Sequence, residues 1–340
     1  MSRTVRYNPA DEEGLDDAER SVTSVGKDSK TAHVDAGEAR ISTQPQSPYP
    51  RVRTFARRGD RMGSTLARTF EKFRSNYLLD LPRFSTTAVA SQARVDAQVM
   101  FGREAPLVVE VGCGNGQQIC AAAAANPDVN FLGFEVWLPG IAKAVSSAVR
   151  RYEGLPNLRL ADVDALQALP ILFADAPATV TELWTFFADP WPKKRHHKRR
   201  LVGTEFSQIA AGLLIDGGLW RLATDWADYA WQMRDVIDAA PQFVNPYAGQ
   251  RPDPEDPAGQ RGGFAPRFEG RIKTAFERRA AREGRRVWDL CAQRLSREAG
   301  LSSRSGEVFP GASSAESPEI PEKPVVREFS IRPPWYEEQS

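Results

Sequence analysis

Cysteine and histidine are scarce in this sequence, with 3 of each among 340 residues. Cys113, Cys120 and Cys291 lack the spacing of a disulfide framework and that of a metal site. Proteins of a reducing compartment rarely hold disulfides, so we expect a cytoplasmic protein. Because the cysteines also lack metal-ligand spacing, we expect no bound metal.

Long apolar runs are also lacking. No stretch of about 18 consecutive apolar residues occurs, and Met1-Ser2-Arg3-Thr4 leads into polar sequence rather than into the apolar segment of a signal peptide. We therefore expect a protein that neither spans a membrane nor is secreted.

The chain has almost no net charge, at +1 from 45 Lys and Arg against 44 Asp and Glu. Its basic residues are nevertheless concentrated in two stretches, 51–74 and 193–200. Because nucleic-acid binding requires cations on one face and not an overall excess, this distribution is compatible with an RNA or DNA partner.

Composition divides the chain into three parts. Residues 1–50 are polar with few large apolar groups, which predicts a disordered N-terminal tail. Residues 300–340 are rich in Ser, Pro and Glu, which predicts a flexible C-terminal tail. The apolar and aromatic residues within 329–336 suit docking on the folded body, although a disordered tail with incidental aromatics is the favoured interpretation. One folded domain, residues 51–299, lies between the tails.

Strands and helices alternate within this domain. The apolar patterns predict strands at 107–111, 130–135, 158–160, 180–188, 219–223 and 287–295. They predict helices at 117–126, 141–151, 201–214, 229–239 and 272–283, with Gly217-Gly218 ending the third of these. This alternation predicts an α/β fold with a Rossmann-like, doubly wound, mostly parallel sheet.

A glycine-rich loop follows the first predicted strand. It has the form E-x-G-x-G-x-G, with Glu110 at the end of the strand and glycines at 112, 114 and 116. Glycines there allow a sharp turn and close approach of a ligand at the carboxyl edge of the sheet. Dinucleotide sites use G-x-G-x-x-G, and a carboxylate at this position would repel a pyrophosphate but attract an ammonium group. The loop therefore favours S-adenosyl-L-methionine over NAD.

Two further acidic positions complete the predicted cofactor site. Glu135 ends the second strand and is placed to accept hydrogen bonds from ribose hydroxyls, a role shared by both cofactor classes. Asp164 follows the third strand and is placed for the adenine edge. Asp162 competes with it on spacing, and for either residue an ordinary exposed loop carboxylate is an equal alternative.

The stretch Asp189-Pro190-Trp191-Pro192 follows the fourth predicted strand, so it emerges beside the cofactor loop. Its prolines make the loop rigid and hold Asp189 and Trp191 in fixed positions. The carboxylate of Asp189 is suited to accept from N1–H and the exocyclic amine of guanine, and Trp191 is suited to stack on a base. The alternative is a Pro-rich turn in which Trp191 anchors the core.

A basic run comes next, with six cations and no acidic residue. A helix start that carries only cations is unfavourable for the helix dipole, so the run favours an external anion such as RNA phosphate over a merely solvated face. The two adjacent histidines have no Cys or carboxylate cluster beside them, which argues against a metal site. The predicted contacts are Lys193, Lys194, Arg195, His196, His197, Lys198, Arg199 and Arg200. The earlier stretch 51–74, with Phe55, Phe70 and Phe73 among its cations, is consistent with a second phosphate contact.

From residue 51 to residue 295 the sequence closely resembles the bacterial tRNA (guanine-N7-)-methyltransferase family, whose fold is the class I S-adenosyl-L-methionine-dependent methyltransferase fold. The glycine loop is common to many methyltransferases, whereas the other motifs together are specific. These are Phe131-Leu132-Gly133-Phe134-Glu135, Asp189 to Lys193 with 195–200, Ala223-Thr224-Asp225-Trp226, and Thr274 to Arg279 leading to Val287-Trp288-Asp289-Leu290.

The resemblance implies formation of 7-methylguanosine at position 46, in the tRNA variable loop. It implies cofactor contacts from Glu110, Glu135, Asp164 and Asp189, and substrate contacts from Lys193, Asp225, Thr274, Ala275, Phe276 and Glu277. The sequence departs from the family pattern at Ala188, where a proline is usual, and at Ala275, where a lysine is common. The second change removes a cation beside the substrate, for which Lys273 is placed to compensate.

Guanine N7 carries a lone pair and no proton, so methyl transfer to it requires alignment and not a general base. We therefore expect Asp189 to orient guanine and the cofactor and to help offset the positive charge that develops on the purine. The alternatives are another base methyltransferase, for example one acting on an exocyclic amine, and an RNA-binding homologue without activity; an NAD-dependent dehydrogenase is disfavoured by the glycine spacing. The sequence favours neither a monomer nor a homodimer.

Overall fold

The computed structural model describes residues 53–56, 59–250, 262–297 and 330–333. The expected tail at 1–50 lies outside the described residues, as does most of the expected tail at 300–340.

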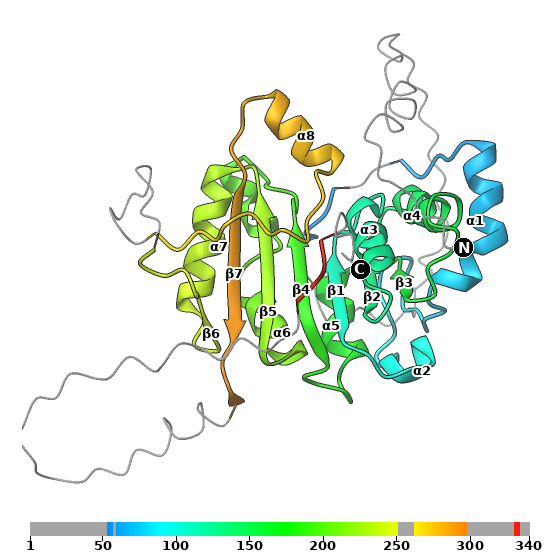
Figure 1. The fold of residues 1–340 in the computed structure, drawn as a ribbon, viewed down its shortest axis with the longest axis horizontal. Coiled ribbons are helices and arrows are strands. Elements are labelled where there is room, and N and C mark those ends of the chain that lie inside the picture. Colours follow the sequence, from blue (N-terminus) through cyan, green and yellow to red (C-terminus); the bar gives the residue numbers. More distant parts are fainter. Residues whose placement is uncertain (1–52, 57–58, 251–261, 298–329, 334–340) are drawn as a thin grey trace, which may run out of the picture. The chain divides into compact units, whose positions relative to one another are not determined.

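The described strands form one sheet in the order β3-β2-β1-β4-β5-β7-β6 (Figure 1). Neighbours from β3 to β5 are parallel, whereas β7 is antiparallel to both β5 and β6. The strands are β1 Leu107–Val111, β2 Asn130–Phe134, β3 Leu158–Ala161, β4 Val180–Phe186, β5 Leu214–Thr224, β6 Phe243–Val244 and β7 Trp288–Arg294. This confirms the predicted mostly parallel, doubly wound sheet.

Helices cover both faces of the sheet, because its central strands are apolar on both sides; all five residues of β1 are buried. One core cluster joins the sheet to α1 Ser64–Tyr77, α3 Gln117–Ala125 and α4 Leu138–Arg150. The other joins it to α5 Ala165–Leu172, α6 Thr204–Leu213 and α7 Ala227–Ala239. The helices α2 Ala97–Phe101 and α8 Ala275–Arg282 and the 3₁₀ helix η3 Lys194–Arg199 complete the described elements.

The order of strands creates a switch point between β1 and β4, where the chain changes direction across the sheet. Loops that leave neighbouring strands diverge at such a point and open a crevice at the carboxyl edge. Because β7 runs antiparallel, it begins at this same edge, and α8 lies above the sheet there (Figure 1).

Several predicted element boundaries are wrong; β5, for example, begins at Leu214 and not at residue 219. Gly217-Gly218 do not end α6, because the helix stops at Leu213 and both glycines lie inside β5. The helix predicted from residue 272 begins instead at Ala275, because Thr274 caps it by accepting a hydrogen bond from Glu277 N. The sequence did not predict α1, α2, α5 or β6.

Residues 330–333 pack against the domain, contrary to the favoured interpretation of the C-terminal tail. Ile331 is 3% exposed and belongs to the core cluster around α3. The Asn126 side chain accepts from Arg332 N at 2.7 Å and donates to Arg332 O at 3.1 Å. Ile331 and Arg332 therefore dock on the folded domain.

Candidate active site

A pocket opens at the switch point between β1 and β4. Its walls come from the loops that follow β1, β2, β3 and β4, from residues 54–56 near the N-terminus, and from the segment 271–276 that leads into α8. The predicted residues Glu110, Glu135, Asp164 and Asp189 all line it. Four carboxylates that are far apart in the sequence thus face one cavity.

The glycines of the loop have two different roles. Gly112 and Gly114 line the pocket with φ of 78° and 57°, a region that favours glycine. Gly116, predicted to contact the cofactor, is not a lining residue; a Cβ on it would lie 2.4 Å from the Ala144 Cβ. Gly116 therefore allows α3 and α4 to pack closely.

Glu110 is a buried carboxylate with an unsatisfied oxygen. Its side chain is 3% exposed, and Oε2 has no hydrogen-bond partner among the described residues. Burial, together with the negative charge of Glu135, raises the pKa of Glu110 to about 8. An orphaned buried acid at the wall of a pocket is suited to receive a cation such as an α-ammonium group.

Glu135 is held in place by the backbone around it. Its Oε2 accepts from Gly114 N and its Oε1 from Trp137 N, each at 2.9 Å. These bonds fix the carboxylate against the glycine loop while it lines the pocket. A carboxylate oxygen can accept more than one hydrogen bond, so this group is suited to a ribose hydroxyl.

The structure distinguishes Asp164 from Asp162. Asp164 lines the pocket and caps α5, where its Oδ1 accepts from Leu166 N at 3.1 Å. Asp162 is not a lining residue, and its carboxylate is paired with Arg83. Asp164 is therefore the residue of the two that faces the cavity.

The loop after β4 is held by residues near the N-terminus. Asp189 Oδ2 accepts from Ala56 N at 3.2 Å, and Trp191 Nε1 donates to Thr54 O at 3.0 Å. The guanidinium of Arg199 lies 4.8 Å from the centre of the Trp191 ring. Trp191 is only partly buried, so it is not a core anchor, and it does not line the pocket. Its stacking on a base stays a prediction.

Residues 194–199 of the basic run form η3. Some side chains of the run are exposed, and others contact neighbouring protein groups. Lys193, Lys194, Arg195 and Lys198 are exposed, whereas His197 lies 3.5 Å from the carboxylate of Asp228. His196 packs edge-on against Trp191, with ring centres 5.8 Å apart. Arg200 differs from the prediction, because it is buried and donates to Pro190 O, Gln232 Oε1 and Asp228 Oδ2. Its role is to support the loop that carries Asp189.

The earlier basic stretch also separates into two kinds of residue. Phe70 is buried and Phe73 packs against the same cluster, whereas the cations Arg68 and Lys72 of α1 are exposed. Phe55 lines the pocket. Phe70 and Phe73 are thus internal contacts, whereas Phe55 faces the cavity and the cations Arg68 and Lys72 face solvent.

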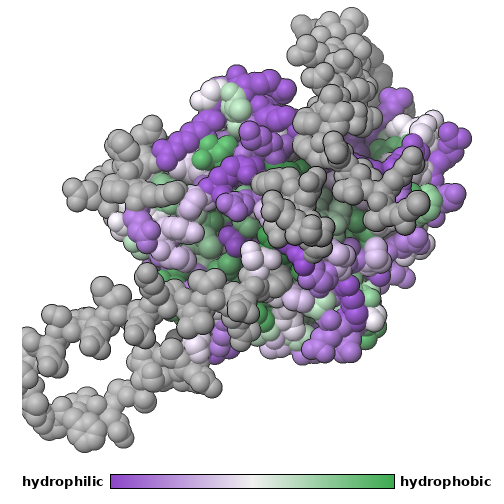
Figure 2. Space-filling view, viewed as in Figure 1, coloured by the Kyte–Doolittle hydropathy of each residue, from purple (hydrophilic) through white to green (hydrophobic). Residues whose placement is uncertain are grey.

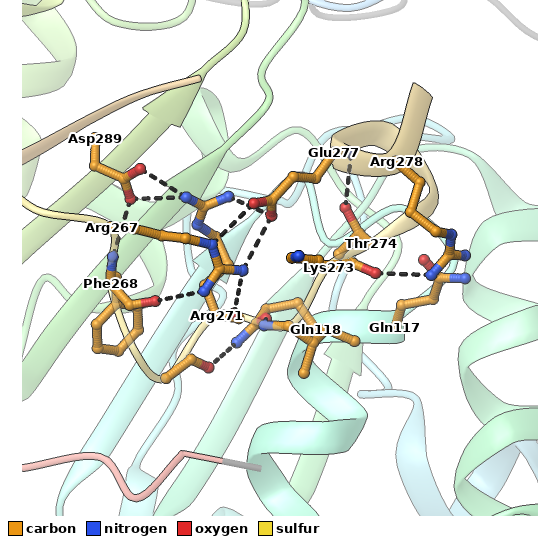
Figure 3. Close-up of polar contacts among 12 residues, drawn as sticks. Gln117, Gln118, Arg267, Phe268, Arg271, Lys273, Thr274, Glu277, Arg278 and Asp289 are labelled. Atoms are coloured by element: carbon orange, nitrogen blue, oxygen red, sulfur yellow. Dashed lines mark hydrogen bonds and ion pairs between the residues drawn. The ribbon is translucent and has the colours of Figure 1, made fainter. Parts of the chain in front are cut away.

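The segment that leads into α8 is anchored on both sides (Figure 3). Gln118 accepts from Ile272 N at 2.8 Å and donates to Gly270 O at 2.9 Å, and Gln117 accepts from Ala275 N at 2.9 Å. Arg271, fully buried, pairs with Glu277 and with Asp289 of β7 at 2.7 Å each. This segment is therefore fixed to α3 and to the sheet.

Two residues that the resemblance implies as substrate contacts form ion pairs with other side chains of the protein. Glu277 is 9% exposed and is paired with Arg267 as well as with Arg271. Asp225 is paired with Arg285 at 2.8 Å and is not a lining residue of the pocket. Thr274 and Phe276, by contrast, line the pocket.

Sequence reasoning missed residues 54–56, Phe187 and Arg271 as parts of the pocket wall. The first set lies about 50 residues before the glycine loop, and no local pattern connects the two. Phe187 lies near the end of the strand predicted at 180–188, but its φ of 54° depends on the fold. Arg271 had no signal beyond its position three residues before Thr274.

Neither a cluster of metal ligands nor a membrane-spanning helix occurs in the part of the chain that the structure describes. No group of three or more His, Cys, Asp or Glu side chains gathers there around a possible metal position. None of the described helices is long and apolar enough to cross a membrane.

Comparison with known proteins shows the family of the chain. A family model described as "Putative methyltransferase" matches residues 104–290. A tRNA (guanine-N(7)-)-methyltransferase of Arthrobacter sp. (strain FB24) is 39% identical over 279 residues, covering 71% of this chain and 86% of that protein. One of Cutibacterium acnes (strain DSM 16379 / KPA171202) is 44% identical over 245 residues, covering 72% and 83%. One of Paenarthrobacter aurescens (strain TC1) is 35% identical over 300 residues, covering 74% and 98%. The chain belongs to the tRNA (guanine-N(7)-)-methyltransferase family.

Proposed function

We propose that this protein transfers the methyl group of S-adenosyl-L-methionine to N7 of guanine 46 in the variable loop of tRNA, forming 7-methylguanosine. The observation that carries the proposal is the shared cavity at the switch point. Glu110, whose Oε2 has no hydrogen-bond partner among the described residues, lines it from β1, and Asp189 lines it from the loop after β4. A tRNA substrate supports the expectation of a cytoplasmic protein.

The residues of the pocket fit the cofactor part by part. Glu110 is suited to the ammonium of the methionine moiety, Glu135 to the ribose hydroxyls, and Asp164 to the adenine edge. At Gly112 and Gly114 no side chain stands between the loop backbone and the cavity. When bound, the cofactor supplies an electrophilic methyl group on a sulfonium ion.

The guanine requires orientation and not deprotonation. Asp189 accepts one backbone hydrogen bond, from Ala56, and a carboxylate has acceptor capacity for further donors. It is placed to accept from N1–H and the exocyclic amine of guanine and to offset positive charge on the purine. Holding the base in line with the methyl group provides the rate acceleration.

The exposed cations of the basic run supply the sequence-independent part of tRNA binding. Lys193, Lys194 and Arg195 follow directly after the Asp189 loop, so bound phosphates would lie close to the pocket. Arg199 and Arg200 hold the loop through Trp191 and Pro190. The basic run therefore combines phosphate contacts with support of the loop that carries Asp189.

The test is incubation of the full chain with labelled S-adenosyl-L-methionine and tRNA that lacks 7-methylguanosine. Mass spectrometry of the nucleosides identifies the product, and chemical cleavage at 7-methylguanosine maps its position. Label in 7-methylguanosine at position 46 supports the proposal. Label in N1- or N2-methylguanosine, or cofactor binding without transfer, overturns it.

A further inference from the structure

Asp225 and Arg285 form an ion pair beside the candidate active site. Asp225 directly follows β5, and Arg285 lies between α8 and β7. Nε and Nη2 of Arg285 both contact Oδ2 of Asp225, at 2.9 and 2.8 Å. Among the described residues, every contact of this carboxylate uses Oδ2, and Oδ1 accepts no hydrogen bond. The pair therefore engages one oxygen and leaves the other available.

The backbone of Asp225 lies next to the wall of the pocket. Phe187 lines the pocket, and its amide N–H donates to Ala223 O at 2.8 Å. The hydroxyl of Thr224 accepts from Trp226 N at 3.3 Å, which fixes the turn that carries Asp225. Because Asp225 does not line the pocket itself, it is placed to meet a nucleotide that enters beside the cofactor.

The end of α8 holds the backbone of Arg285. Gly284 has φ of 66°, the left-handed conformation that commonly ends a helix. Gly284 N donates to Ala281 O at 3.1 Å and Arg285 N donates to Ala280 O at 2.8 Å, which is the Schellman pattern. The ion pair thus joins two anchored segments, the end of β5 and the end of α8.

The guanidinium of Arg285 is poorly suited to bind a tRNA phosphate. The surface over α8 is mostly hydrophilic (Figure 2), and Arg282 in its last turn is exposed, with no ion pair among the described residues. Arg285, by contrast, contacts Glu283 as well as Asp225, so two carboxylates offset its charge. These contacts favour a role within the protein over a role as a free surface cation.

We infer that Arg285 is a positioning residue for methyl transfer, which holds Asp225 ionised and in one orientation so that Oδ1 accepts from a donor group of the target nucleotide. The inference rests on the proposed function. The resemblance implies a substrate contact for Asp225 and none for Arg285. A guanidinium that binds a carboxylate through two donors stabilises its charge and restricts its rotation. The nucleotide then meets a preorganised acceptor, which helps to hold its base in line with the methyl group.

The test is a double-mutant cycle with Asp225→Ala, Arg285→Ala and both together. Arg282→Ala, which removes the same charge from the last turn of α8, is the matched control. Single-turnover rates of tRNA methylation are measured at saturating S-adenosyl-L-methionine and saturating tRNA, and tRNA affinity is measured across salt concentrations. Calorimetry of cofactor binding shows whether the pocket is intact in each variant. If Arg285→Ala does not bind the cofactor, Arg285→Lys replaces it, because lysine keeps the charge but lacks the two-donor fork.

We expect Arg285→Ala to lower the single-turnover rate by about tenfold, with cofactor affinity unchanged, and Arg282→Ala to retain the wild-type rate. In the Asp225→Ala background, Arg285→Ala should cause no further loss, because the carboxylate that it positions is absent. A wild-type rate in Arg285→Ala, or losses that add independently, overturns the inference. A smaller salt slope in Arg285→Ala than in the wild type also overturns it, because it would show a phosphate contact.

Failure of this inference differs from failure of the proposed function, because every rate is compared with that of a wild type that forms 7-methylguanosine. A wild type that forms another methylated nucleoside overturns the proposed function. The cycle then still decides whether Arg285 acts through Asp225.

Discussion

The carboxylate of Asp189 accepts a hydrogen bond from Ala56 N across 3.2 Å, although 133 residues separate them in the chain. The contact brings residues 54–56 over the wall of the pocket, and the neighbouring bond from Trp191 to Thr54 O reinforces it. The position of the proposed guanine-binding carboxylate therefore depends on a segment far from the cofactor loop.

Replacing Asp189 with asparagine tests its charge while preserving its size. An amide oxygen still accepts from Ala56 N, but the negative charge that offsets the methylated purine is lost. We expect the single-turnover rate, measured at saturating S-adenosyl-L-methionine, to fall about 100-fold, with unchanged thermal stability. Full turnover with unchanged tRNA affinity would falsify the orienting and electrostatic role.

Binding of S-adenosyl-L-methionine should release a proton from Glu110. Without a ligand this carboxyl, with its pKa raised to about 8, is mostly protonated at neutral pH. An ammonium partner favours the ionised form, so cofactor affinity should rise with pH, by up to tenfold per unit, until pH reaches about 8. Calorimetry in two buffers of different ionisation enthalpy measures the released proton. Glu110→Gln should abolish both the release and the pH dependence; persistence of either rules out Glu110 as the source.

The same group sets a pH dependence of stability in the cofactor-free protein. Its folded pKa of about 8 lies above the ordinary value of 4.5, so the folded state binds the proton more strongly than the unfolded state. The free energy of unfolding should therefore decline as pH rises from about 4.5 to about 8. Urea unfolding at several pH values should show a smaller decline in Glu110→Gln than in the wild type. Equal declines would contradict the assignment.

Neutralising the exposed cations of the basic run should weaken tRNA binding and flatten its salt dependence. Each lost phosphate contact lowers the slope of log affinity against log salt by about 0.7 to 0.9. Filter binding of Lys194→Ala, Arg195→Ala and Lys198→Ala across salt concentrations measures this slope. A slope that stays at the wild-type value excludes these residues as phosphate contacts.

Arg200, from the same run, should affect folding instead. Arg200→Ala removes hydrogen bonds to Pro190, Gln232 and Asp228 from a side chain that is 1% exposed. We expect the free energy of unfolding to fall by about 2 kcal/mol, whereas Lys198→Ala leaves it nearly unchanged. Thermal denaturation of the two variants gives the comparison, and equal melting temperatures would show that the buried contacts contribute little.

Gly116→Ala should be more damaging than Gly102→Ala. Both glycines have positive φ, 76° and 67°, so alanine costs about 1–2 kcal/mol at either. At Gly116 the new Cβ also meets Ala144, whereas at Gly102 nothing lies within 4 Å. The additional overpacking should cost about 1–3 kcal/mol. Similar losses of unfolding free energy in the two variants would contradict the role of Gly116 in helix packing.

The sequence by itself determined the fold class and the cofactor loop. Their signals are local: an apolar run such as 107–111 must be buried on both faces, and the glycines that follow it permit one kind of turn. The motifs around Asp189 and Thr274 also sufficed to indicate the family. Local patterns misplaced the boundaries of α6 and α8, because packing and capping decide where a helix ends.

The tertiary structure decided which side chains reach the pocket. Asp162 and Asp164 are equivalent in the sequence, but Arg83 engages the first and the cavity receives the second. Arg200 looks like its basic neighbours but is buried, and Phe187 lies near Phe276, which belongs to a helix that begins 88 residues later. Such relationships depend on contacts between segments that are distant in the sequence. The spacing of residues along the chain does not determine the direction in which each side chain points.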